Sequence, residues 1–189
     1  MKTMIAKDVG KYSGQPLEEL LSAEQIGIRV QEMGRQISRD YAEKTPIVIG
    51  VLNGSIIFMA DLIRQMTTAC EIDFIKISSY YDDIKSSGTV RLLKDISCMI
   101  TRRDVIVVED IIDSGLSAKF IRQRLLESEP ASVAFATLLL KPDVVDVPFD
   151  IEYVGFRIPN RFVVGYGLDL DQKMRNFPAI WAFPEGMEV

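Results

Sequence analysis

The sequence predicts an α/β fold: a mainly parallel twisted sheet with helices on both faces, plus a small C-terminal/N-terminal hood subregion. Apolar segments of strand length alternate with segments of helical periodicity, and the strand segments are apolar on both sides. Strands buried on both faces are typical of parallel sheets covered by helices. From Asp150 onward the pattern changes to short strands and turns. We therefore expect a single domain over residues 1–189, with a core at about 20–145 and the hood-like subregion at about 150–189.

A capping box at Ser22–Gln25 predicts the start of the first helix. Apolar residues then recur at spacings of three or four and define one buried face: Ile26, Val30, Met33, Ile37 and Tyr41. Pro46 ends this helical pattern. A buried strand is predicted over Ile47–Leu52, and a second helix over about Ile56–Met66.

The second half of the predicted core continues the alternation. A strand is predicted over Ile72–Ile77, and a polar run without a core-building pattern follows at Tyr80–Gly88. The next elements are a strand, a helix and a strand, at Asp104–Glu109, Leu116–Leu126 and Val133–Leu139. Three short strands follow, at Ile151–Phe156, Phe162–Gly165 and Ala179–Phe183. We expect these last strands to lie over the carboxyl edge of the sheet, where open α/β sheets bind ligands.

The composition limits the possible chemistry. The formal net charge is −5 and the chain contains no histidine. Imidazole-based zinc sites and Ser-His or Cys-His nucleophile pairs are therefore excluded, and proton transfer near neutral pH must use Asp, Glu, Lys or Tyr. The acidic balance also argues against broad nucleic-acid binding, which usually needs a basic face.

Neither a membrane segment nor an export signal is predicted. The longest apolar stretches, such as Ser132–Leu140, are too short to span a bilayer, and the N-terminal residues lack the apolar core of a secretory signal. Cys70 and Cys98 have no metal-ligand spacing and do not suggest a disulfide framework. We expect buried thiols in a reducing compartment, and therefore a cytoplasmic protein without a membrane partner.

The segment Val105–Ser117 carries the most chemical information. Its β-branched residues predict a central strand, and three carboxylates, Glu109, Asp110 and Asp113, follow where that strand leaves the sheet. A Ser-Gly-x-Ser motif at Ser114–Ser117 then runs into a helical pattern. Backbone N–H groups at such a turn, with a helix N-terminus behind them, form an anion cradle, and glycine lets the backbone approach a phosphate. The segment suits a ligand that carries both a phosphate and diol hydroxyls.

Other interpretations of this segment limit or oppose that hypothesis. The chain has no G-x-x-x-x-G-K-[ST] motif, which excludes a nucleoside-triphosphate P-loop. Glu109 and Asp110 could be a solvated strand end, and Ser114–Ser117 could be a plain helix cap. Three acids followed by Ser-Gly-x-Ser at fixed offsets after a buried strand favour the phosphate cradle over these alternatives.

The same segment resembles the phosphoribosyl-pyrophosphate loop of the type I phosphoribosyltransferases. Further segments resemble the hypoxanthine(-guanine) phosphoribosyltransferases of that family: Val51–Ser55 with Ala60–Leu62, Ser78–Tyr80 through Ser86–Gly88 and Leu93–Asp95, Leu139–Pro142, and Tyr153–Asn160 through Phe162–Asp169 to Arg175–Asn176. The resemblance covers about residues 45–183. It implies a purine-salvage enzyme that transfers phosphoribosyl from phosphoribosyl pyrophosphate to hypoxanthine, and to guanine as well, giving IMP or GMP and pyrophosphate.

The resemblance also implies roles for individual residues. Asp113 would be the catalytic carboxylate near purine N7. The residues implied to bind phosphoribosyl pyrophosphate are Leu52, Asn53, Gly54, Glu109, Asp110, Ser114, Gly115, Leu116, Ser117 and Arg175. Those implied to bind the purine are Lys141, Phe162, Val163 and Asp169. Magnesium is the implied cofactor, with the ligands Glu109, Asp110 and Asp169.

Further implications concern the loops and the assembly. A lid is implied over Tyr81–Gly88, preceded by the lid residues Ser79 and Tyr80, and the peptide bond Leu52–Asn53 is implied to be cis. Some family members carry lysine or arginine where this chain has Asn53, so backbone N–H groups must hold the pyrophosphate there. The family resemblance implies a homodimer or homotetramer.

Simpler roles stay open for several of these residues. Lys141 could be a solvated loop lysine, Phe162 ordinary core, Asp169 a turn aspartate and Arg175 part of a surface ion pair. The run Tyr81–Gly88 could be a disordered surface loop. Two other functions also stay open: a non-catalytic regulator that senses phosphoribosyl pyrophosphate on the same fold, and a transferase that prefers xanthine. The acidic charge favours an enzyme over a regulator that would need a nucleic-acid surface.

Overall fold

The computed structural model describes residues 2–80 and 89–184. The predicted lid segment Tyr81–Gly88 lies outside them. Of the predicted lid residues Ser79 and Tyr80, the backbone is described, and it forms the end of strand β4.

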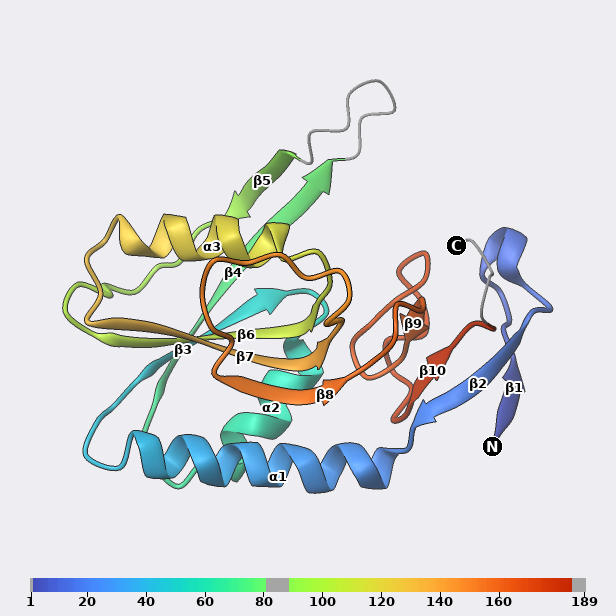
Figure 1. The fold of residues 1–189 in the computed structure, drawn as a ribbon, viewed down its shortest axis with the longest axis horizontal. Coiled ribbons are helices and arrows are strands. Elements are labelled where there is room, and N and C mark those ends of the chain that lie inside the picture. The colour runs from blue at the N-terminus through green and yellow to red at the C-terminus, as the bar shows by residue number, and fades with distance from the viewer. Residues whose placement is uncertain (1, 81–88, 185–189) are drawn as a thin grey trace.

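A six-stranded sheet forms the centre of the molecule (Figure 1). Its order is β5-β4-β3-β6-β7-β8, and all its neighbouring strands pair in parallel except β5, which is antiparallel to β4. The strands are β3 (Ile47–Leu52), β4 (Glu71–Tyr80), β5 (Thr89–Lys94), β6 (Asp104–Ile112), β7 (Ser132–Leu140) and β8 (Tyr153–Arg157). The central strands β3, β6 and β7 are buried over most of their length, which explains their apolar sequences.

Helices cover both faces of this sheet. Helices α1 (Ala23–Asp40) and α2 (Ile56–Gln65) lie on one face, and α3 (Leu116–Leu126) lies on the other (Figure 1). The predicted capping box begins α1, where Ser22 Oγ accepts from the Gln25 backbone and Gln25 Oε1 accepts from the Ser22 backbone. The predicted fold class is therefore confirmed. None of the described helices combines the length and hydropathy that crossing a bilayer requires.

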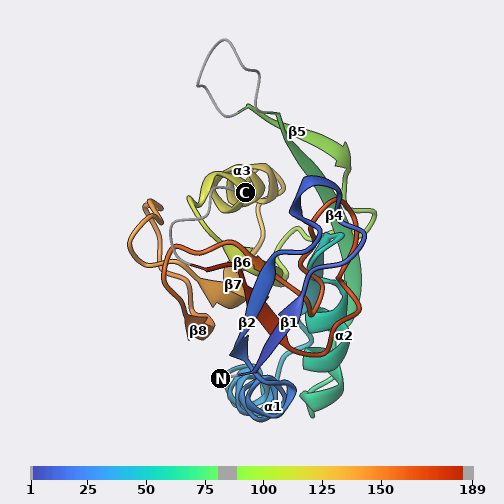
Figure 2. The same cartoon turned by 90° about the vertical axis from the view of Figure 1, so that its right-hand side faces the viewer.

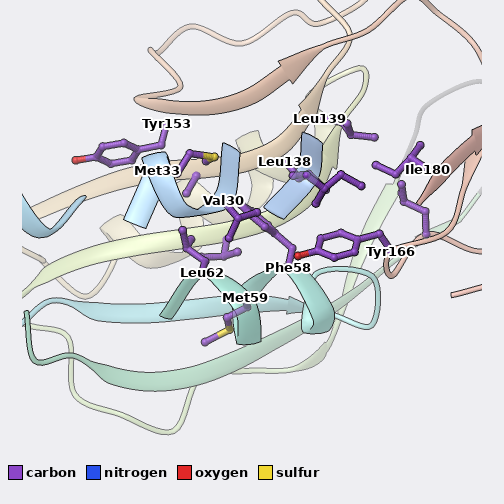
Figure 3. Packing of buried hydrophobic residues seen from close by; sticks show 14 of the residues in the cluster. Val30, Met33, Phe58, Met59, Leu62, Leu138, Leu139, Tyr153, Tyr166 and Ile180 are labelled. Atoms are coloured by element: carbon purple, nitrogen blue, oxygen red, sulfur yellow. The ribbon is translucent and has the colours of Figure 1, made fainter. Parts of the chain in front are cut away.

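Two hydrophobic clusters fill the spaces between the sheet and its helices. The cluster under α1 and α2 includes Val30, Met33, Val48, Phe58, Met59, Leu62, Ile106, Val108 and Leu138 (Figure 3). The cluster under α3 includes Ile47, Ile49, Val105, Val107, Ala118, Ile121, Leu125 and Phe135. Neighbouring residues of one strand enter opposite clusters because successive side chains of a strand point to opposite faces.

A second sheet of four antiparallel strands lies beyond the carboxyl ends of the parallel strands (Figures 1 and 2). Its order is β1-β2-β10-β9. The strands are β1 (Thr3–Ile5), β2 (Pro16–Leu21), β9 (Val163–Val164) and β10 (Ile180–Ala182), with the short 3-10 helix η1 (Gly10–Tyr12) between β1 and β2. We call this sheet and its loops, residues 2–21 and 159–184, the hood.

Several elements differ from the prediction. The prediction placed Ile151–Phe156 in the smaller subregion, whereas β8 pairs in parallel with β7 and belongs to the main sheet. Strands β1, β2 and β5 are not predicted by the sequence pattern, since β1 and β2 are short and β2 pairs with β10 from the other end of the chain. Strand β6 continues to Ile112 rather than ending at Glu109, because its last residues keep pairing with β7.

Candidate active site

A cavity of about 290 Å³ lies where β6 meets α3. One continuous segment, residues 109–118, forms most of its wall, and Val51 of β3 and Ile77 of β4 complete it. The strand, the turn and the first turn of the helix therefore all face the same space. This is the segment in which the sequence analysis places the phosphate cradle and the acids.

Two adjacent acids from β6 lie in the wall of this cavity. Glu109 is 4% exposed, and its Oε1 atom has no hydrogen-bond partner among the described residues. Burial raises the pKa of Glu109, and the neighbouring Asp110 raises it further. Burial also raises the pKa of Asp110, against hydrogen bonds from backbone N–H groups and the charge of Arg175. The arrangement is not a solvated strand end, and it suits ligand hydroxyls or a cation.

The turn after β6 leads directly into α3. Gly115 is the residue before the helix, with φ of +85°, a left-handed conformation that favours glycine. A Cβ atom at Gly115 would collide with Val147. Gly115 has no side chain, so it cannot accept a hydrogen bond from the first N–H groups of α3 as a Ser, Thr or Asp cap would. Ser114, Leu116 and Ser117 line the cavity at this point, and the N–H groups at the start of a helix can bind an anion.

Lys141 and Asp113 form an ion pair at the ends of two neighbouring strands. Ile112 of β6 pairs with Leu140 of β7, and Asp113 and Lys141 follow directly after these two strands. Lys141 Nζ donates to Asp113 Oδ2 at 2.7 Å. Lys141 is 6% exposed, so it is not a solvated loop lysine, whereas the Asp113 side chain is 52% exposed beside the cavity.

The turn between β3 and α2 packs against Asp110. The peptide bond Leu52–Asn53 is cis, which confirms the prediction. A Cβ atom at Gly54 would collide with the Asp110 carboxylate, and a Cβ atom at Gly167 would collide with the Gly54 carbonyl oxygen. The predicted pyrophosphate loop therefore lies between an acid of the main sheet and a loop of the hood.

That hood loop carries Asp169 and Arg175, which pair with each other at 2.7 Å. Asp169 also accepts from the Gln172 backbone, as a turn aspartate does, and Arg175 Nη1 donates to the Gly167 carbonyl at 2.7 Å. The charges of both side chains act on Asp110. Neither residue lines the cavity, so the structure brings them near the acids but not into the cavity wall.

Phe162 lies in the hood, before β9. It is 37% exposed, so it is not ordinary core, and its ring centroid lies 6.0 Å from that of Phe183. Val163 is buried and pairs with Ala182 of β10. Neither Phe162 nor Val163 lines the cavity.

The sequence analysis assigned no role to two contacts that hold the hood. Arg161 donates to the Phe183 carbonyl through two nitrogens and to Glu18 of β2 at 2.7 Å. The Tyr166 hydroxyl donates to Asp61 of α2 at 2.6 Å. An acid at position 61, inside the apolar segment Ile56–Gln65, is the one signal that could have indicated the second contact.

Known proteins are similar to this chain over most of its length. Residues 16–171 match the model of the phosphoribosyl transferase domain family. A hypoxanthine-guanine phosphoribosyltransferase of Streptococcus mutans is 43% identical over 166 residues, which cover 88% of this chain and 92% of that protein. The protein of the same name from Mycobacterium tuberculosis is 43% identical over 175 residues, which cover 89% of this chain and 87% of that protein.

Solved structures show the same similarity. A hypoxanthine-guanine phosphoribosyltransferase of Bacillus anthracis, with a HEPES molecule in its active site, has a TM-score of 0.84 and 46% identity, covering 88% of this chain and 98% of that chain. A hypoxanthine phosphoribosyltransferase of Staphylococcus aureus has a TM-score of 0.84 and 39% identity, covering 88% and 91% of the two chains.

Proposed function

This chain belongs to the phosphoribosyl transferase family, and we propose from that membership that it is a purine-salvage enzyme. It transfers the phosphoribosyl group of phosphoribosyl pyrophosphate to hypoxanthine, and to guanine as well, with pyrophosphate as the second product. The observation that carries the proposal is the wall of the cavity. Glu109 and Asp110 lie there in one segment, residues 109–118, with the N–H groups that begin α3, and a sugar phosphate needs both acids and an anion-binding group.

The sugar phosphate would occupy the cavity with its two ends recognised differently. The 5′-phosphate would accept from the N–H groups at the start of α3 and from the Ser114 and Ser117 hydroxyls. The ribose hydroxyls would donate to Glu109 and Asp110, which supplies the donor that Glu109 Oε1 lacks. The pyrophosphate would lie toward Leu52–Gly54 and Arg175.

Magnesium is the cofactor that fits these acids. Carboxylate oxygens are the ligands magnesium prefers, and a cation would stabilise the ionised forms of Glu109 and Asp110 that burial disfavours. The described residues contain no group of three or more His, Cys, Asp or Glu side chains placed to hold a metal, so substrate oxygens would complete the coordination. Asp169 would have to leave its ion pair with Arg175 to become a further ligand. Bound magnesium would neutralise charge on the pyrophosphate leaving group.

Asp113 and Lys141 are the groups that would act on the purine. One of the three N–H donors of Lys141 is used by Asp113, which leaves two for the 6-oxo oxygen of the base. Purine N9 would attack C1 of the sugar while the bond to pyrophosphate breaks, and Asp113 would accept the proton that the purine releases at N7. Phe162, with an exposed ring, would stack on the base, and the Val163 backbone would contact its edge.

A panel of bases tests this function. The purified protein, with magnesium and phosphoribosyl pyrophosphate, should form nucleotide from hypoxanthine and guanine. Adenine should be used at least about 10- to 100-fold less efficiently, since its 6-amino donor would face the donor of Lys141 in a dry pocket. Absence of product with every base would contradict the enzymatic function. Preferential use of xanthine would replace the proposed substrate, and equal use of adenine would remove the role of Lys141.

We also infer that the protein assembles into a homodimer or homotetramer in the cytoplasm. A structural relative is the subject of a study on how its C-terminal region affects oligomeric state and activity. Light scattering coupled to size exclusion should give a mass of two or four chains, and a mass of one chain would contradict the inference. Cell fractionation tests the compartment.

A further inference from the structure

The hood loop between β9 and β10 has a backbone conformation that is unfavourable for residues other than glycine. Gly165, Tyr166 and Gly167 are consecutive residues with φ values of +97°, +50° and +103°. Glycine adopts such values without strain, whereas they are unfavourable for a residue with a side chain such as Tyr166. A bulky side chain is uncommon in this conformation, so a contact that stabilises Tyr166 there favours the observed shape of the loop.

The Tyr166 side chain supplies that contact. Its ring belongs to the hydrophobic cluster that also contains Phe58 of α2 (Figure 3). Its hydroxyl donates to Asp61 Oδ2 on the same helix at 2.6 Å, and burial and Asp61 together raise the pKa of the phenol. The hood loop is thus fastened to α2 by a hydrogen bond to a carboxylate, which is stronger than one between neutral groups.

The two residues of this hydrogen bond belong to the two parts of the molecule that meet at the proposed pyrophosphate position. Tyr166 belongs to the loop that carries Arg175, and Asp61 belongs to the helix that follows the Leu52–Gly54 turn. On one side, the Tyr166 and Gly167 backbone N–H groups donate to the carbonyls of Phe177 and Arg175, and Gly167 accepts from the Arg175 guanidinium. On the other side, α2 begins directly after the Leu52–Gly54 turn, and Gly54 touches both Asp110 and Gly167. The distance between Arg175 and that turn therefore depends on how Tyr166 is held to α2.

We propose that Asp61 and Tyr166 are positioning residues for the pyrophosphate half of the substrate site. Their hydrogen bond keeps the Arg175 loop of the hood in register with the Leu52–Gly54 turn of the main sheet. This proposal rests on the proposed function, which brings pyrophosphate to that place. Neither residue touches the substrate, and neither contributes to the wall of the cavity that would hold the 5′-phosphate.

The test compares three single variants in the full chain. Tyr166→Phe removes the hydroxyl and keeps the ring, Asp61→Asn keeps an acceptor oxygen, and Asp61→Ala removes it. We expect Tyr166→Phe and Asp61→Ala to raise KM for phosphoribosyl pyrophosphate about 5- to 50-fold, the scale of a lost hydrogen bond to a charged group. KM for hypoxanthine should change less than about twofold, and Asp61→Asn should recover most of the loss.

A matched control comes from the other partner of Asp61. Arg64 pairs with Asp61 on the exposed face of α2, and an exposed pair of this kind contributes little. Arg64→Gln should therefore leave both KM values unchanged. Equal increases in the two KM values of Tyr166→Phe, or an effect of Arg64→Gln as large as that of Asp61→Ala, would overturn the proposal.

Hydrogen exchange tests the same link without any substrate. In Tyr166→Phe the amides of Tyr166 and Gly167 should exchange about 5- to 50-fold faster than in the unchanged chain, while the amides of β3 keep their rates. Unchanged exchange at these two amides would overturn the proposal even if the enzyme is active. Absence of nucleotide formation in the unchanged chain would instead contradict the proposed function, and the exchange result would still decide the link.

Discussion

The main sheet and the hood contribute to the site in different ways. The main sheet contributes residues 109–118, a continuous strand, turn and helix start that together line the cavity. The hood contributes Phe162 and the Asp169–Arg175 pair. The residues near them are held by partners distant in sequence, since Arg161 bonds Glu18 of β2 and Tyr166 bonds Asp61 of α2. Local geometry maintains the first part, and long-range contacts maintain the second.

This difference indicates how each part should respond to substitution. Residues of the continuous segment line the cavity in which the proposed reaction would take place, so changes there should lower turnover or change the charge of the site. Residues of the hood would contact one substrate each or support the residues that do, so changes there should weaken the binding of one substrate at a time. The predictions below test that division, from the largest expected effect to the smallest.

Asp113→Asn should produce the largest loss. The amide keeps the shape of the side chain but does not accept a proton, so turnover should fall about 10- to 1,000-fold, the range for a general base. Binding of phosphoribosyl pyrophosphate, measured by calorimetry, should persist. Unchanged turnover, measured where chemistry limits the rate, would dismiss Asp113 as the catalyst.

Lys141→Ala should lower kcat/KM for hypoxanthine by about 10- to 100-fold. The difference in kcat/KM between hypoxanthine and adenine should become smaller. Lys141 is buried, and in the proposed role it would donate to the 6-oxo group, whereas adenine offers no acceptor there. Steady-state kinetics with both bases measures the ratio. If hypoxanthine and adenine lose activity in equal proportion, Lys141 has a structural role and does not select the base.

Glu109→Gln should change how stability depends on pH. The pKa of Glu109 is raised in the folded chain, so the folded state holds a proton that the unfolded state has already lost, and stability falls as pH rises from the ordinary glutamate pKa to the raised one. Glutamine has no such proton. In the absence of ligands, the variant should gain on the order of 1–2 kcal/mol in free energy of unfolding at pH 8, and less at pH 5.

Urea unfolding at the two pH values measures this difference. An equal change at both would show that desolvation of the Glu109 carboxylate is not the cause. The same variant, together with Asp110→Asn, should weaken magnesium-dependent binding of phosphoribosyl pyrophosphate.

Arg161→Met should give the smallest effect and test the hood directly. Arg161 donates to the Phe183 carbonyl, and the Phe183 ring contacts Phe162. Loss of the Arg161 guanidinium should therefore make the Phe162 ring more mobile. We expect KM for hypoxanthine to rise about 3- to 10-fold with little change in kcat. Arg122→Met, on α3 over the Phe149 ring, is the matched control and should leave both constants unchanged. A fall in kcat of Arg161→Met without a change in KM would contradict the assignment of substrate binding to the hood and of turnover to the main sheet.

The same division explains which features the sequence could predict. The 109–117 segment and the alternation of strands and helices could be predicted because the residues that indicate each element lie within a few positions of each other. Strand β2 could not be predicted, since it pairs with β10 at the opposite end of the chain, and the three-residue β1 pairs with β2 in turn. The Asp61–Tyr166 contact joins residues 105 positions apart, and the ion pair of Asp169 with Arg175 depends on how a loop rich in left-handed residues turns back on itself.

The register of β6 on β7 also limits which changes of length the chain can accept. Asp113 and Lys141 follow directly after the paired residues Ile112 and Leu140, so the backbone ladder sets their separation. One inserted or deleted residue in either strand would shift one partner by about 3.3 Å and turn its side chain to the opposite face. These strands can therefore diverge in residue identity but not in length.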